Sequence, residues 1–98
     1  MATEPEVLRA ADVDAQLVAR GLHWARQDEV LARSVRRADF AQALAAVNAI
    51  GALAEAADHH PDIDIRWNTV TLRLSTHSAG GITEKDLALA ARIDAEVD

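Results

Sequence analysis

The first apolar positions along the chain are spaced as in a short helix. Val13 and Leu17 lie four residues apart, with Leu8 shortly before them, and a four-residue repeat places apolar side chains on one helix face. Aspartate is a preferred N-cap residue, and glycine commonly ends a helix. We therefore expect a short helix that Asp12 caps and Gly21 closes.

In the next segment, from Trp24 to Arg37, the helical spacing of apolar residues gives way to an approximate alternation of apolar and polar residues, as in a strand. Residues 24–27 and 30–37 flank the polar pair Asp28-Glu29, and two such runs around a short turn are typical of a hairpin. The pair Arg36-Arg37 is interpreted as a solvated strand end rather than an anion-binding site.

The longest helical repeat follows Asp39, which we expect to cap it, and runs to about Ala57. Its apolar residues recur every three or four positions and define the predicted apolar face: Phe40, Leu44, Val47, Ile50 and Leu53. Pro61 prevents the helix from continuing and disfavours helical backbone at the residue before it. His59 and His60 are thus predicted to lie where this helix ends and a loop begins.

Two further alternating runs predict a second hairpin. Ile63, Ile65 and Trp67 share one parity, and Asn68-Thr69 supplies a polar turn. The next strand has an apolar parity of Val70, Leu72, Leu74 and Thr76. We expect the other parity of that strand to point to the opposite face: Thr71, Arg73, Ser75 and His77.

A glycine loop and a last helix complete the pattern. Ala79-Gly80-Gly81 precedes Thr83-Glu84-Lys85-Asp86, which resembles a capping box with Asp86 at the third helical position. The helix that follows carries Leu87, Leu89 and Ile93. The element order is therefore α-β-β-α-β-β-α. We predict an α+β fold, a four-stranded antiparallel sheet with three helices packed on one face, as a single domain over residues 1–98.

Composition removes several classes of function. The 98 residues include no Cys, which excludes a disulfide framework, a Cys-ligated zinc site, an iron–sulfur cluster and a cysteine nucleophile. Sixteen acidic residues against ten basic ones give a net charge of −6, without the basic footprint of a nucleic-acid-binding protein. No apolar run approaches the ~20 residues of a membrane span, and Met1–Glu6 lacks the order of a signal peptide. We expect a soluble, cytoplasmic protein without nucleic-acid or membrane partners.

The residues able to do chemistry lie at element ends: Glu55, His59, His60, His77 and Asp86. Glu55 stands four residues before His59, so its carboxylate can reach and orient that imidazole. Histidine exchanges protons near neutral pH, and three histidines with two carboxylates would make a proton-transfer site. Taken singly, each has a structural explanation, as a helix-end cap, a capping-box acid or a solvated residue.

The histidines also admit two other interpretations. His23, beside Trp24, is interpreted as background. Metal binding is the rival for the other three histidines, but adjacent His59 and His60 project in different directions and match no common ligand spacing. We therefore predict no metal site.

The spacing of these residues resembles a known family motif. Glu55-Ala-Ala-Asp-His59-His60-Pro61 is followed after five residues by Trp67, after nine more by His77, and after eight more by Asp86. This pattern resembles that of the pterin-4a-carbinolamine dehydratases, and the resemblance extends over roughly residues 12–94. It departs from the family along the second predicted strand and the long helix, where aromatic residues are replaced by Val35, Arg36 and many alanines.

The resemblance implies an enzyme that dehydrates 4a-hydroxytetrahydropterin to quinonoid dihydropterin, recycling a pterin cofactor, without a metal or redox cofactor of its own. His59, His60 and His77 would line the pterin pocket, with His59 and His77 as the acid/base pair and His60 orienting the substrate. Glu55 would hold His59 or a pterin nitrogen, and Asp86 would bracket the site or fix His77. Three further residues would contribute to the pocket wall and form backbone hydrogen bonds to the pterin ring: Pro61, Ser75 and Thr76.

The same resemblance leaves a second function open. Some relatives are transcriptional coactivators or Rubisco assembly factors, so the chain is alternatively a non-catalytic interaction module on this fold. The assembly-factor relatives have a degraded histidine motif, and the intact trio here argues against that role. Small size and the resemblance together predict a homodimer, with a tetramer as the alternative.

Overall fold

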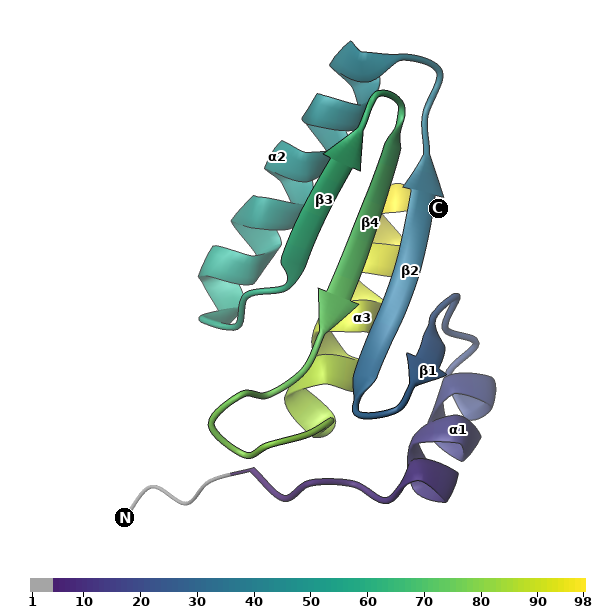
Figure 1. Ribbon diagram of the computed structural model, residues 1–98, viewed down its shortest axis with the longest axis vertical. Coiled ribbons are helices and arrows are strands. Elements are labelled where there is room, and N and C mark those ends of the chain that lie inside the picture. The colour runs from purple at the N-terminus through teal and green to yellow at the C-terminus, as the bar shows by residue number, and fades with distance from the viewer. Residues whose placement is uncertain (1–4) are drawn as a thin grey trace.

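The computed structural model describes residues 5–98, so most of the Met1–Glu6 segment lies outside the described residues. Seven elements follow the predicted order (Figure 1): α1 (Ala10–Ala19), β1 (Ala25–Gln27), β2 (Val30–Arg36), α2 (Phe40–Ala57), β3 (Asp62–Arg66), β4 (Thr69–Leu74) and α3 (Glu84–Val97). The predicted order of helices and strands is confirmed.

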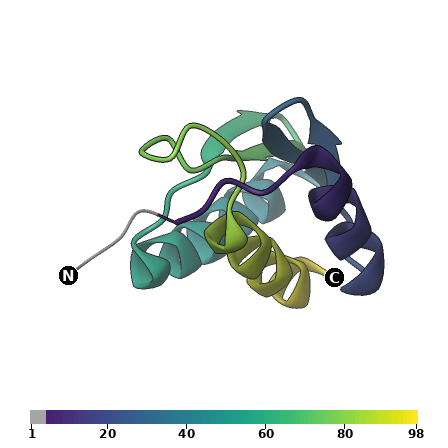
Figure 2. The same cartoon turned by 90° about the horizontal axis from the view of Figure 1, so that it is seen from below.

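The four strands form one antiparallel sheet in the order β1-β2-β4-β3. Figure 2 shows α2 and α3 side by side on one face of the sheet, with α1 beside the β1 end. Successive side chains of a strand point to opposite faces of the sheet, and here the apolar set points toward the helices, which explains why they cover one face. The strand residues of that set that are fully or nearly fully buried are Leu31, Val35, Val70, Leu72 and Leu74. Opposite them, α3 contributes Leu87, Ala90 and Ile93, all fully buried.

The predicted apolar face of α2 is only partly the buried one. Ile50 is fully buried, but Phe40 and Leu44 are 48% and 43% exposed. Val47 and Leu53 are partly buried and pack against the core, and the other buried residues of α2 are small: Ala43, Ala46 and Ala54. Because alanine lets a helix approach a sheet closely, the closest contact runs along this alanine row and leaves Phe40 and Leu44 outside. Only 22% of α2 is buried.

By length and composition α2 would also fit a membrane span, with a mean hydropathy of 1.4. A helix that covers a sheet in a folded domain passes the same test. Here α2 contacts β3, β4 and α3, so its hydropathy is weak evidence for a membrane span.

The helix ends agree with the sequence at three of four predicted positions. The Asp39 carboxylate accepts from the Gln42 amide at 2.8 Å, and Thr83 and Asp86 form the capping box of α3. Gly21 closes α1 with a φ of +62°, as Leu22 donates to the Leu17 carbonyl. The prediction for Asp12 is wrong, because α1 begins earlier: Arg9 is the N-cap residue, and Asp12 lies within the first turn.

The second hairpin turns one residue earlier than predicted. Its loop is Trp67-Asn68, since Arg66 pairs with Thr69. The Asn68 side chain is buried and donates to the Arg37 carbonyl at 3.1 Å, while the Arg37 amide donates to the Asn68 carbonyl at 2.8 Å. These contacts with the end of β2 fix the turn, and Trp67 takes a left-handed φ of 49° with its indole exposed.

Strand β4 also ends earlier than predicted, at Leu74. Thr76 therefore lies beyond the strand and forms an isolated bridge with Gly81, with the Thr76 amide donating to the Gly81 carbonyl at 2.9 Å. His77 is the first residue of the loop that this bridge closes and does not lie on a strand.

Candidate active site

Four element ends meet at one end of the sheet, in the lower left part of Figure 1. Because β3 and β4 are antiparallel, the start of β3 lies beside the end of β4, with Asp62 opposite Arg73. The carboxyl end of α2 leads into β3, and the loop after β4 leads into α3. This topology brings together residues that are separated in sequence by 20 to 30 positions, including His59 and Asp86.

The centre of this end of the sheet is a hydrogen-bonded contact between the His59 imidazole and the buried carboxyl group of Asp86. His59 Nε2 lies 2.5 Å from Asp86 Oδ1; the His59 side chain is 12% exposed and Asp86 is fully buried. Asp58 ends α2 in a left-handed conformation, and the His59 amide donates back to the Ala54 carbonyl at 3.1 Å. That reversal of the chain turns the imidazole of His59 toward α3.

The other oxygen of Asp86 is satisfied by two donors. Thr76 Oγ1 donates to Oδ2 at 2.8 Å, and the Thr83 amide donates to the same oxygen at 2.9 Å. The two threonine hydroxyls lie 2.8 Å apart. Burying a carboxylate is energetically unfavourable unless its oxygens accept hydrogen bonds. Here the capping of α3, Thr76 and the contact with His59 together supply those bonds.

Glu55 pairs with His60, not with His59 as the four-residue spacing predicted. The spacing rule holds inside a helix, but α2 ends at Ala57 and the left-handed Asp58 interrupts it. Both partners of the Glu55–His60 pair are exposed, with side chains 79% and 56% accessible. They form an exposed acid/base pair beside the buried one.

The prediction that Asp86 fixes His77 is wrong. Asp86 holds His59 instead of His77, and the exposed His77 side chain makes no hydrogen bond to another described residue. The Ser75 hydroxyl donates to the Glu29 carbonyl at 3.1 Å, in the turn between β1 and β2. The Thr76 hydroxyl donates to Asp86, and the predicted contribution of Ser75 and Thr76 to the pocket wall and its backbone hydrogen bonds stays a prediction. Pro61 is half-buried just before β3, and its contribution to a pocket wall stays a prediction.

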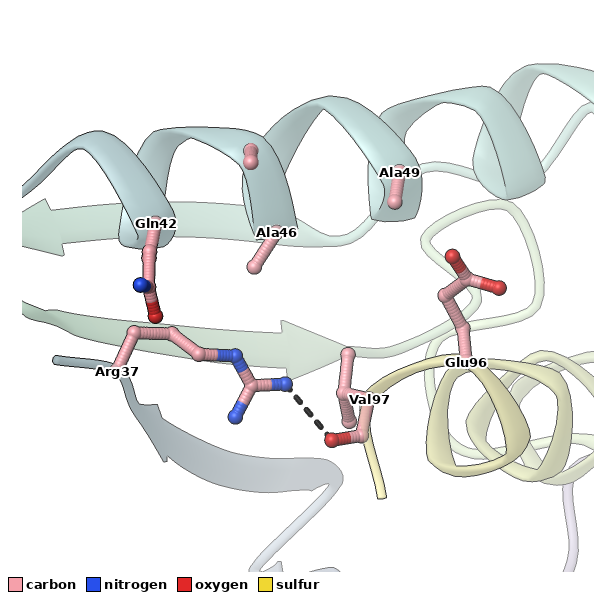
Figure 3. Close-up of a pocket in the computed structure, with 7 residues that line it drawn as sticks. Arg37, Gln42, Ala46, Ala49, Glu96 and Val97 are labelled. Atoms are coloured by element: carbon pink, nitrogen blue, oxygen red, sulfur yellow. Dashed lines mark hydrogen bonds between the residues drawn. The ribbon is translucent and has the colours of Figure 1, made fainter.

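Two hollows flank α2 at its opposite ends. One, of about 200 Å³, lies beside the buried pair and is lined by Ala57, His59, Lys85, Ala88, Leu89 and Arg92. The other, of about 300 Å³, lies between the start of α2 and the end of α3, where Arg37 donates to the Val97 carbonyl at 2.7 Å (Figure 3). None of the predicted site residues lines this second hollow.

A second cluster of charges, which sequence reasoning missed, lies at the far end of α3. Asp94 accepts from Trp24 Nε1 at 2.7 Å and from the His23 amide at 2.8 Å, and Arg33 pairs with both Asp94 and Asp98. Its signal in the sequence was Arg33, a charged residue on the core-facing parity of β2, between Leu31 and Val35.

In this second cluster, His23 contacts Asp98 with 2.6 Å between Nδ1 and Oδ2, so it has a structural partner in this network. His23, Asp94 and Asp98 offer ligand atoms within 4.8 Å of one another. Arg33, however, already pairs with both carboxylates and compensates part of their charge. The hydrogen bond from Arg33 has the largest effect on the pKa of Asp98 and lowers it; burial opposes this, and the weaker hydrogen bond from His23 adds to the lowering, so that the pKa is about 2.

Comparisons with known proteins agree over nearly all of this sequence. A family model described as pterin 4 alpha carbinolamine dehydratase matches residues 6–96. A protein of Mycobacterium sp. (strain JLS) is 54% identical over 92 residues, covering 94% of this chain and 97% of that protein. One of Chloroflexus aurantiacus (strain ATCC 29366 / DSM 635 / J-10-fl) is 52% identical over 87 residues, covering 89% and 92%. Both carry the provisional name pterin-4-alpha-carbinolamine dehydratase.

Solved structures show the same fold. A transcriptional coactivator/pterin dehydratase from Brucella melitensis matches with a TM-score of 0.86 at 31% identity, over 95% of this chain and 100% of that one. A pterin dehydratase-like protein described as a RuBisCO assembly factor in the alpha-carboxysome matches with a TM-score of 0.60 at 28% identity, over 76% and 86%. Sequence and fold thus point the same way: the chain belongs to the pterin 4 alpha carbinolamine dehydratase family, whose named activity is that of a hydro-lyase.

Proposed function

We propose that this chain dehydrates 4a-hydroxytetrahydropterin to quinonoid dihydropterin and water by histidine acid/base catalysis, recycling a tetrahydropterin cofactor. Family membership supports the reaction class. The observation that carries the proposal for the site is the His59–Asp86 pair, an imidazole held by a buried carboxylate beside a small hollow. Buried carboxylate–imidazole pairs are a recurring device for proton transfer.

The reaction requires two proton transfers. Hydroxide is a poor leaving group from C4a, so an acid must protonate that oxygen while a base removes the proton on N5. In our proposal His59 and His77 form this pair, and His60, held by Glu55, orients the pterin. The negative charge of Asp86 compensates the positive charge that His59 acquires when it accepts a proton. Water does not screen this interaction at the carboxylate, because Asp86 is fully buried. Exposed His77, on the loop that ends at the Thr76–Gly81 bridge, would approach the substrate from the other side.

The proposal is tested by turnover of enzymatically generated 4a-hydroxytetrahydropterin. Wild type should exceed the uncatalysed rate, and His59→Ala and His77→Ala should each lose roughly 10²–10⁴-fold in activity. His23→Ala is the matched control, since His23 lies in the other charge cluster. The pH profile should show ionisations in the histidine range, and chelators should leave the rate unchanged. A wild-type rate equal to the uncatalysed one would end the enzyme proposal.

A second candidate function comes from the structural neighbours. The Brucella melitensis protein is described as a coactivator as well as a dehydratase, and the other neighbour as an assembly factor. A non-catalytic interaction module on this fold would keep binding its partner when His59 and His77 are replaced. Turnover above background that depends on both histidines favours the enzyme.

We further propose that the chain forms a homodimer. β3 is an outer strand of the sheet, so one row of its backbone N–H and C=O groups has no strand partner within residues 5–98. Exposed apolar side chains lie on this side of the molecule, on α2, β3 and the hairpin loop: Phe40, Leu44, Ile63 and Trp67. A second copy pairing along β3 would satisfy the strand edge and cover part of this apolar surface.

Sedimentation should give twice the protomer mass of 10.5 kDa, and Ile63→Lys with Leu44→Gln should reduce it to the protomer. The control is Val18→Gln, an equally apolar residue that is 83% exposed on α1 at the opposite edge of the sheet. A mass of four protomers would indicate the tetramer instead, and a monomeric wild type would contradict the proposal. The cytoplasmic location and the single-domain extent over residues 1–98 also stay proposals.

A further inference from the structure

We propose that the hydroxyl of Thr83 is a positioning group for His59, acting through Thr76 and Asp86. The inference rests on the proposed function for its kinetic consequence, but not for its structural one. Thr83 and Asp86 are fully buried and Thr76 is 3% exposed, so neither threonine hydroxyl is available to a substrate. Their effect on chemistry must pass through the His59 imidazole.

Hydrogen bonds link Thr83, Thr76 and Asp86 in series, and the direction of each follows from the number of protons available. An ionised Asp86 has no proton to give, so Thr76 Oγ1 donates its single hydrogen to Oδ2 at 2.8 Å. The 2.8 Å contact between Thr76 Oγ1 and Thr83 Oγ1 then needs its proton from Thr83. Thr83 Oγ1 accepts in turn from the Lys85 amide at 3.2 Å. The donors therefore run in one direction, from Lys85 through Thr83 and Thr76 to Asp86.

These donors determine which oxygen of Asp86 faces His59. Asp86 Oδ2 is occupied by Thr76 and by the Thr83 amide, which leaves Oδ1 directed at His59 Nε2, 2.5 Å away. Since the carboxylate only accepts, Nε2 must carry a hydrogen. The nitrogen that exchanges a proton with the substrate is therefore Nδ1, which makes no hydrogen bond to another described residue.

Capping of α3 alone does not require this arrangement. A cap needs only an acceptor for a backbone amide, and Asp or Asn serves as well as Thr. The proton that Thr83 donates to Thr76 has no part in capping. It does fix Thr76 as a donor toward Asp86, because Thr76 Oγ1 then has an accepting contact as well as a donating one.

The test has a structural readout and a kinetic readout. In the wild type, NMR should show His59 with a proton on Nε2, giving a slowly exchanging, downfield N–H resonance above the pH at which the ring titrates. Thr83→Val and Thr76→Val should weaken or abolish this resonance and lower kcat about tenfold, as expected for one lost hydrogen bond. KM should change little, because neither hydroxyl meets the substrate. Thr83→Ser should restore both readouts.

The matched control is Asp39→Ala, which removes the cap of α2 and lowers stability without touching the chain of hydroxyls. If Thr83→Val loses stability as Asp39→Ala does but keeps the resonance and kcat, Thr83 is only a cap and the inference is wrong. A wild-type His59 with Nε2 unprotonated overturns it directly. If the resonance behaves as expected while the wild type shows no turnover, the positioning stands and the proposed function fails.

Discussion

At the scale of single residues, Asp86 serves two purposes that are usually separate. It closes the capping box of α3 through the Thr83 amide and holds the His59 imidazole through its other oxygen. Asp86 is also fully buried. Its charge is therefore neutralised only by its hydrogen-bond donors, which makes the site sensitive to any change in their number.

Replacing this carboxylate with an amide should invert the proton pattern at His59. In Asp86→Asn the amide oxygen can still accept from Thr76 and Thr83, so its NH2 group would face His59 Nε2 and force that nitrogen to act as acceptor. A comparable inversion in a serine protease triad costs about 10⁴-fold in kcat, and we expect a loss of that order. Dehydration kinetics measure it, with Asp12→Asn, on the exposed face of α1, as the control. Wild-type kcat in Asp86→Asn would contradict the role of the carboxylate.

His59 and His60 should differ in stability although they are neighbours in sequence. His60→Gln breaks an exposed pair with Glu55, and exposed ion pairs contribute only about 0–1 kcal/mol. His59→Gln removes a partner of a buried carboxylate, and we expect this variant to lose about 1–3 kcal/mol of unfolding free energy. Urea denaturation of the two variants measures the difference, and equal losses would show that the Asp86 contact contributes little to folding.

Which residues belong to the candidate site could be predicted from sequence, but their pairing could not. The spacing of Glu55, His59, His60, His77 and Asp86 was visible because family motifs are sequence patterns. The partners depend on one backbone conformation, the left-handed Asp58 with φ of 48°. It turns His59 toward α3 and leaves Glu55 with His60. No local rule predicts a left-handed aspartate there.

At the scale of elements, α2 shows where counting large apolar residues misleads. Its contact with the core uses Ala43, Ala46, Ile50 and Ala54, so three of the four buried residues are ones that the apolar repeat ignored. The element itself, its cap and its end were predictable because Asp39 and Pro61 act locally. Which face is buried depends on the distance between helix and sheet, which small side chains set.

Enlarging the alanine row should therefore destabilise the fold, while the same change on the outer face should not. Ala43 is fully buried and Ala52 is exposed on the same helix. Ala43→Leu should lower the free energy of unfolding by about 1–3 kcal/mol through overpacking, and Ala52→Leu by less than about 0.5 kcal/mol. Denaturant unfolding of both variants makes the comparison. Similar values for the two would place the contact face of α2 elsewhere.

At the scale of the whole molecule, two charge networks hold the ends of α3. At its start Asp86 joins it to the end of α2 through His59; at its end Asp94 and Asp98 join it to β2 and to the start of β1 through Arg33, His23 and Trp24. The order of elements and the single antiparallel sheet followed from periodicity. These long-range pairs did not, because they join residues 27 to 75 positions apart in sequence.

The second network makes a prediction about acid stability. Arg33 holds the pKa of Asp98 at about 2, below its ordinary value of 3.8. A lowered pKa means that the carboxylate stabilises the fold fully above about pH 4, and that this contribution is lost as the pH falls from 3.8 toward 2. Wild type should therefore exceed Asp98→Asn in unfolding free energy at pH 7, and the two should converge near pH 2. The difference should be modest and should shrink in high salt, because Asp98 is partly exposed and solvent screens the pair.

Urea midpoints at pH 7, 4, 3 and 2 measure the difference between wild type and Asp98→Asn, with Asp12→Asn as a control that should change little over the series. A constant difference between wild type and Asp98→Asn at every pH would show that the residue acts through packing and not through its charge.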